Sequence, residues 1–168
     1  FQIGPMKTIT PKPARRAKAR ILILDDHPIM REGLAQLLAR EPDLQVCAEA
    51  HDAREALDKI ARHAPDLLLA DLSLPGRSGL DLIKDLHVQH PDVKVLVLSM
   101  HDESLYAERV LRAGGRGYIM KQEGGKKLLA AIRKVLDGQI SVSERMAGRI
   151  LEIFAGGKPQ GNGSSVES

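Results

Sequence analysis

Short aliphatic runs alternate with segments of helical periodicity from residue 20 onward, and this alternation limits the possible folds more than any other feature of the chain. The expected strands are residues 20–25, 44–49, 66–70, 93–98 and 116–119. The expected helices are residues 28–40, 53–63, 79–90, 103–113 and 125–137. Several strands are almost continuously apolar, as is typical of strands covered on both faces. The sequence therefore predicts an α/β fold of the (βα)5 type, a doubly wound five-stranded parallel sheet with helices on both faces.

Composition divides the 168 residues into four expected parts. Residues 1–19 are expected to be a disordered basic tail, and FQIGP at its start resembles a remnant of cloning. Residues 20–137 form the expected α/β domain, and residues 138–155 a linker helix. Within that helix the amphipathic segment 141–155 has Ser141 and Glu144 at the spacing of a capping box. Residues 156–168 are rich in Gly, Ser and Asn and are expected to be a flexible linker to a further domain.

The charge and the cysteine content exclude several function classes. The formal net charge of +3 comes from 25 basic and 22 acidic residues, but six of the basic residues and none of the acidic ones lie in the first 20 residues. The remaining body is therefore slightly acidic, and basicity alone predicts no DNA binding. No apolar stretch is long enough to cross a membrane. Cys47 is the only cysteine, so no disulfide can form within the chain, and we expect a cytoplasmic protein.

Polar side chains follow four of the expected strands. Asp25 and Asp26 follow the first strand and Asp71 the third, while Ser99 and Lys121 follow the fourth and fifth. Because the carboxyl ends of parallel strands meet at one edge of a sheet, these side chains are expected to converge. Adjacent carboxylates repel each other unless a cation lies nearby. Three of them make an oxygen-rich site that suits Mg²⁺.

The same set of groups predicts phosphoryl chemistry. A divalent cation on one side and the ammonium of Lys121 on the other would hold a dianionic phosphoryl group, with Asp71 between them as the nucleophile. A plainer interpretation treats Asp25 and Asp26 only as a capping pair before Pro28. That interpretation leaves Asp71, Ser99 and Lys121 unexplained.

Four motifs carry a resemblance to a known family. They are DDHP at 25–28, DLSLPGRSGL at 71–80, VLSMHDE at 97–103 and AGGRGYIMK at 113–121. In this order and on these strand ends, they resemble the receiver domain of a two-component response regulator, more narrowly one of the NarL/FixJ type. The resemblance covers about residues 20 to 137 and implies the flavodoxin-like receiver fold.

The resemblance also implies a role for each matching residue. Asp71 would accept a phosphoryl group from a sensor histidine kinase. Mg²⁺ would be bound by Asp26, Asp71 and the backbone carbonyl of Ser73, with Asp25 acting mostly through water. Lys121 and Ser99 would bind the phosphoryl oxygens.

Ser99 and Tyr118 would together form a switch that alters the face made by residues 103–137. The chain would then be a signalling switch that promotes only its own phosphorylation and dephosphorylation, and not an enzyme with a separate substrate.

Two details of the chain modify this picture. Gln122 follows Lys121 where many receivers have proline, and Gly124 and Gly125 are a poor start for the helix that follows. His27 is expected to be a surface residue that tunes access to the site at most.

Other functions stay open at this point. A Mg²⁺-dependent phosphohydrolase of the haloacid dehalogenase kind also forms an aspartyl phosphate, although Ser73 stands where that family places its general acid. A degenerate receiver that switches without phosphate is a third possibility.

The NarL/FixJ resemblance further implies partners for the whole protein. These are a sensor histidine kinase, a second copy of the chain after phosphorylation, and DNA. DNA would be bound only through a C-terminal helix-turn-helix domain that this chain lacks, and no membrane partner is expected.

Overall fold

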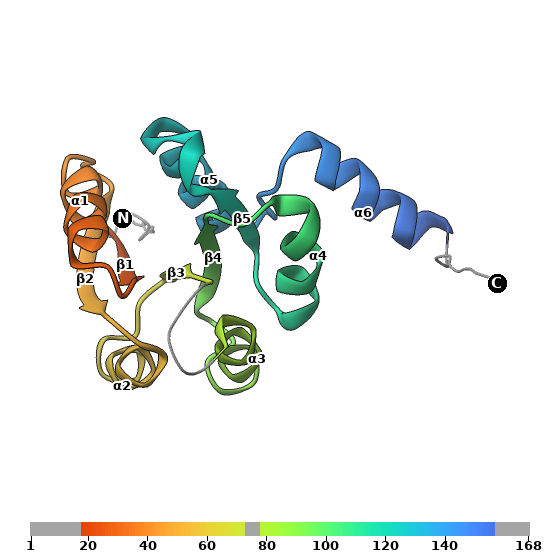
Figure 1. Cartoon of the computed structure of the whole chain (residues 1–168). Coiled ribbons are helices and arrows are strands. Elements are labelled where there is room, and N and C mark those ends of the chain that lie inside the picture. Colours follow the sequence, from red (N-terminus) through yellow and green to blue (C-terminus); the bar gives the residue numbers. More distant parts are fainter. Residues whose placement is uncertain (1–17, 73–77, 157–168) are drawn as a thin grey trace, which may run out of the picture.

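The structure is a computed structural model that describes residues 18–72 and 78–156 (Figure 1). Its strands are β1 (Ala19–Leu24), β2 (Leu44–Ala50), β3 (Leu67–Asp71), β4 (Lys94–Ser99) and β5 (Gly117–Met120). Its α-helices are α1 (Pro28–Ala39), α2 (Ala53–His63), α3 (Gly79–Gln89), α4 (Glu103–Ala113), α5 (Gly125–Leu136) and α6 (Glu144–Gly156), and a 3-10 helix, η3, covers Lys121–Glu123. The expected tail and the expected flexible linker lie almost wholly outside the described residues, so both stay predictions.

All five strands are parallel and lie in the order β2-β1-β3-β4-β5. Each strand sends alternate side chains to opposite faces of the sheet, so Leu22 and Leu24 enter one apolar cluster while Ile21 and Ile23 enter the other. Helices α1 and α5 cover one face, and α2, α3 and α4 cover the other, as Figure 1 shows. The predicted doubly wound parallel fold is confirmed.

The strand order places a topological switch point at the carboxyl edge of the sheet. Strand β1 pairs with β2 on one side and with β3 on the other, so the connections from β1 and β3 leave toward opposite faces. Ligands of open parallel sheets bind beyond the carboxyl ends of the strands at such a switch point. The motif residues Asp25, Asp26 and Asp71 lie at this edge.

The expected capping box at the start of α6 is wrong. Ser141 pairs instead with the free edge of β5: its amide donates to the Arg116 carbonyl, and its carbonyl accepts from the Tyr118 amide, both at 2.9 Å. This backbone pairing holds Ser141 outside the helix. Ser143 caps α6 in its place, since its hydroxyl accepts from the Met146 amide at 3.1 Å.

The first turn of α6 is docked on its own domain. Met146 is 3% exposed and belongs to the same apolar cluster as Tyr118. A carboxylate oxygen of Glu103, the first residue of α4, accepts from the Ser143 amide at 2.9 Å. Farther along, α6 extends away from the sheet beyond α4 (Figure 1), and Leu151 is exposed. The start of α6 is therefore held by α4.

None of the described helices is long and apolar enough to cross a bilayer.

Candidate functional site

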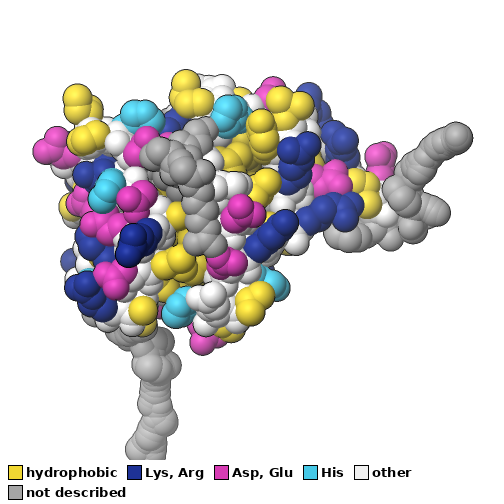
Figure 2. All heavy atoms as spheres, turned by 60° about the horizontal axis from the view of Figure 1, so that its bottom comes forward, with side chains coloured by type: hydrophobic (Ala, Val, Ile, Leu, Met, Phe, Trp, Pro, Cys, Tyr) yellow, Lys and Arg dark blue, Asp and Glu magenta, His cyan; other side chains and the backbone are white. Residues whose placement is uncertain are grey.

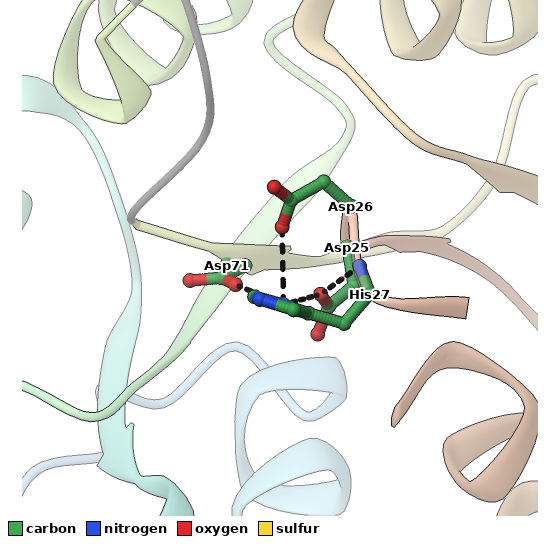
Figure 3. Close-up of side chains that lie close together, drawn as sticks. All are labelled: Asp25, Asp26, His27 and Asp71. Atoms are coloured by element: carbon green, nitrogen blue, oxygen red, sulfur yellow. Dashed lines mark hydrogen bonds and ion pairs between the residues drawn. The ribbon is translucent and has the colours of Figure 1, made fainter. Parts of the chain in front are cut away.

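Three carboxylates and one imidazole meet at the carboxyl ends of β1 and β3. Asp71 is the last residue of β3, and Asp25 directly follows β1; they are 3% and 1% exposed. One ligand atom from each of Asp25, Asp26, His27 and Asp71 lies within 4.8 Å of the others (Figure 3). Strand register explains the convergence, because Leu24 of β1 lies beside Ala70 of β3. The structure thus brings together the acidic residues that the sequence singled out.

Lys121 supplies a buried cation next to this cluster. It follows β5 directly, and its side chain is only 8% exposed. Its Nζ donates to Oδ2 of Asp71 at 3.2 Å and lies 3.7 Å from Oδ2 of Asp25. A buried ammonium next to a buried carboxylate both neutralises it and fixes its orientation. The amine therefore holds the carboxylate that the sequence analysis assigned as nucleophile.

His27 takes a larger part in the site than the sequence analysis expected. Its ring is 64% exposed, but Nδ1 lies 3.0 Å from Oδ1 of Asp25, 3.1 Å from Oδ1 of Asp26 and 3.9 Å from Oδ2 of Asp71 (Figure 3). The His27 amide also donates to Oδ1 of Asp25 at 2.9 Å. The only signal in the sequence was that His27 directly follows the two aspartates.

The acidic cluster fits a hard divalent cation. Oδ1 of Asp26 is buried and lies 3.1 Å from Nδ1 of His27, but no described group donates it a hydrogen bond of good geometry. Buried oxygens of this kind need a partner, and carboxylate oxygens are the ligands that Mg²⁺ prefers. Asp25, Asp26 and Asp71 are the residues that could hold such an ion. Ser73, whose carbonyl was expected to complete the set, lies outside the described residues.

Ser99 and Tyr118 meet at the backbone of His101. Ser99 ends β4 and is fully buried, and its hydroxyl accepts from the His101 amide at 3.0 Å. The Tyr118 hydroxyl donates to the His101 carbonyl at 2.8 Å. Burial raises the pKa of Tyr118, and its hydrogen bond with Ser99 offsets part of that rise. The Tyr118 ring is buried in this structure. The sequence analysis did not predict that His101 is the partner that Ser99 and Tyr118 share.

The turn after Lys121 is built without the usual proline. Lys121, Gln122 and Glu123 form η3, and a carboxylate oxygen of Glu123 accepts from the Met120 amide at 3.2 Å. Helix α5 then begins at Gly125, after Gly124 with φ of 93° and no side-chain cap. The prediction that Gly124 and Gly125 give this helix a poor start therefore agrees with the structure, in which α5 has no side-chain cap. The 3-10 turn holds the backbone near Lys121 in place of a proline ring.

Comparison with known proteins defines the class. The chain matches the response regulator receiver domain family over residues 21–133 and belongs to that family. It is a receiver domain of the NarL/FixJ type, as the following relatives show.

The chain is 35% identical over 137 residues to the transcriptional regulatory protein DegU of Brevibacillus brevis. The matched region covers 82% of this chain and 58% of DegU. It is 37% identical over 140 residues to the oxygen regulatory protein NreC of Staphylococcus haemolyticus, covering 83% and 64%. The chain thus spans about three-fifths of the length of these two relatives.

Two solved structures resemble the fold. One is a two-component response regulator of the LuxR family from Aurantimonas sp. SI85-9A1, with a TM-score of 0.75 and 35% identity, covering 83% of this chain and 99% of that one. The other is the signal receiver domain of the response regulator NarL from Mycobacterium tuberculosis, with a TM-score of 0.70 and 30% identity, covering 74% and 100%.

Proposed function

We propose that this receiver domain accepts a phosphoryl group on Asp71 from a phosphohistidine of a sensor histidine kinase, in a reaction that requires Mg²⁺. The observation that carries the proposal is the buried ammonium of Lys121, 3.2 Å from an Asp71 oxygen, facing a cluster of two further carboxylates. Phosphoryl transfer asks a protein mainly to position the reactants and to neutralise charge. This arrangement of one cation and three acids suits both tasks.

The transfer itself needs little from the protein besides orientation. One P–O bond forms to a carboxylate oxygen of Asp71 while the P–N bond of the phosphohistidine breaks. The kinase imidazole leaves with the electron pair of the P–N bond, and it leaves neutral because its other ring nitrogen carries the proton. Lys121 donates to the phosphoryl oxygens, and the buried position of Asp71 limits the access of water.

Mg²⁺, held by Asp25, Asp26 and Asp71, would supply positive charge toward the phosphoryl oxygens. The imidazole of His27 lies beside the same carboxylates, 3.0 Å from Asp25 and 3.1 Å from Asp26.

The response to phosphorylation would begin at Ser99. A dianion on Asp71 offers the Ser99 hydroxyl a new acceptor, and the bond that this hydroxyl now accepts from the His101 amide would weaken. Because Tyr118 bonds to the carbonyl of the same residue, the change would reach β5. It would also reach α4, which begins two residues after His101. The face made by α4, β5 and α5 would then alter its affinity for partners.

The altered face would control a C-terminal DNA-binding domain and thereby transcription in the cytoplasm. This part of the proposal is supported by the relative named as a transcriptional regulatory protein. It is also supported by structural relatives described as RcsB dimers bound to DNA. On the face shown in Figure 2, basic side chains lie among acidic ones. Because of this mixed charge, we expect the chain to have weak specific affinity for DNA by itself. By analogy with the RcsB dimers, we also expect it to dimerise on phosphorylation.

The experiment that tests the proposal is incubation with a small phosphodonor and Mg²⁺, followed by intact-mass measurement. The chain should gain the mass of one phosphoryl group, and a chelator should prevent this gain. Asp71→Asn should take up none, while Asp58→Asn, which removes an exposed carboxylate elsewhere, should behave as the parent. Uptake by Asp71→Asn, or no uptake by the parent, would contradict the proposal. Continuous release of phosphate would instead indicate a hydrolase.

A further inference from the structure

Arg31 makes two contacts that the proposed reaction does not use directly. It lies in the first turn of α1, and its side chain is 21% exposed. Its Nη1 donates to the backbone carbonyl of Asp25 at 2.7 Å. Its Nε donates to a carboxylate oxygen of Glu49 on β2 at 3.2 Å. The guanidinium therefore ties the loop after β1 to the neighbouring edge strand.

The Asp25 carbonyl belongs to the peptide group that joins Asp25 to Asp26. A peptide group is planar and includes both flanking Cα atoms, so holding its oxygen restricts both residues at once. The Asp25 amide is held from the other side, because it donates to the Ala50 carbonyl of β2 at 3.1 Å. Arg31 thus completes the attachment of the acidic pair to β2.

Glu49, the residue of β2 that Arg31 contacts, has a backbone that is itself held in place. Glu49 lies beside Ile23 of β1 in the sheet register. Its carbonyl accepts from Nζ of Lys59 on α2 at 2.6 Å. A planar guanidinium with donors in two directions suits this position, whereas a single ammonium could satisfy only one of the two acceptors well.

We propose that Arg31 is a positioning residue for the divalent cation site, and that it holds the Asp25–Asp26 peptide so that both carboxylates face Asp71. The inference rests on the proposed Mg²⁺ site and adds to it a residue that touches neither metal nor phosphoryl group. Outer partners of metal ligands act in this way by restricting the orientation of the ligands.

The sign of the effect separates positioning from charge. Arg31 is a cation near an acidic cluster, so its charge alone would repel Mg²⁺. If charge were its only influence, Arg31→Gln would bind Mg²⁺ more tightly. If it positions the acidic pair, the same substitution should weaken Mg²⁺ binding by about tenfold.

The test is a calorimetric titration of the phosphate-free chain with Mg²⁺. Arg31→Gln should raise the Kd about tenfold, and Glu49→Gln, which leaves the carbonyl contact in place, should raise it by only about twofold. Arg62→Gln is the matched control, because Arg62 forms an exposed ion pair with Asp58 and, among the described residues, no hydrogen bond or ion pair with the acidic cluster, so the substitution should leave the Kd unchanged.

A second readout uses the metal-free chain. The amides of Asp25 and His27 should lose protection from hydrogen exchange in Arg31→Gln, while the amides of β4 keep theirs. Should Arg31→Gln fail to fold, Arg31→Lys decides: it keeps the charge but not both contacts, so weaker Mg²⁺ binding would support positioning.

Unchanged or tighter Mg²⁺ binding by Arg31→Gln and Arg31→Lys would overturn the role of Arg31 alone. A parent chain that binds no Mg²⁺ would overturn the proposed function as well.

Discussion

Replacing Asp71 by Asn should make the metal-free domain more stable, although it should also abolish the proposed phosphorylation. The Asp71 carboxylate lies within 4.8 Å of those of Asp25 and Asp26 and 3.2 Å from Nζ of Lys121. At an effective dielectric constant of about 20, each repulsion amounts to at least about 3.5 kcal/mol at the 4.8 Å limit, and the attraction to Lys121 to about 5 kcal/mol. With the His27 imidazole counted as neutral, the net repulsion from these three groups is at least about 2 kcal/mol, and the neutral amide removes it.

The assay is thermal unfolding followed by circular dichroism, with a chelator and with saturating Mg²⁺. In the chelator, Asp71→Asn should raise the Tm by about 6 °C for a domain of this size. Saturating Mg²⁺ should stabilise the parent more than the variant, because the variant has lost a ligand. The difference in Tm should therefore shrink or reverse.

The control for this prediction is Asp58→Asn, which removes an exposed helical carboxylate paired with Arg62. It should change the free energy of unfolding by less than about 0.5 kcal/mol in either condition. If Asp71→Asn is no more stable than the parent in the chelator, the acids do not repel each other and the electrostatic argument for a cation site fails.

Three further outcomes follow from individual contacts. Tyr118→Phe removes the hydrogen bond from the Tyr118 hydroxyl to the His101 carbonyl, which is part-buried, and should cost about 1 kcal/mol in urea unfolding; an unchanged midpoint would contradict the contact. Glu103→Ala removes the acceptor of the Ser143 amide and should speed hydrogen exchange in the first turn of α6 but not in α5. If the exchange rates of this first turn are the same in the variant and in the parent, docking through this bond is refuted. The backbone amide of His51 is the main cause that lowers the pKa of Glu55 from 4.5 to about 2, which carboxyl NMR can measure. Because the folded pKa is depressed, the stabilisation is complete above the unfolded value and is lost as pH falls from about 4.5 toward 2, so Glu55→Gln should flatten stability in this window.

The fold and most of the site could be predicted because both depend on local patterns. Continuous apolar runs predict buried parallel strands, and polar residues directly after them must lie at one edge of the sheet. Asp25, Asp71 and Lys121 were found in this way, and the structure places them together.

Other features depended on contacts between segments distant in sequence. Ser141 has the spacing of a capping residue, but its backbone pairs with β5 outside the helix, and Ser143 caps α6 instead. The contact of Arg31 with the Asp25 carbonyl and with Glu49 could not be read from the sequence either, because it depends on how α1 lies against β2.

The sequence by itself determined the order of strands and helices, the parallel sheet and the identity of the acidic and basic groups at its edge, since side-chain chemistry and periodicity are properties of short segments. Only the tertiary structure decided which atoms meet: His27 among the carboxylates, Ser99 and Tyr118 on one backbone unit, and α6 on α4. Such contacts depend on distances of a few ångströms between separate elements, and these are set by packing of the whole domain.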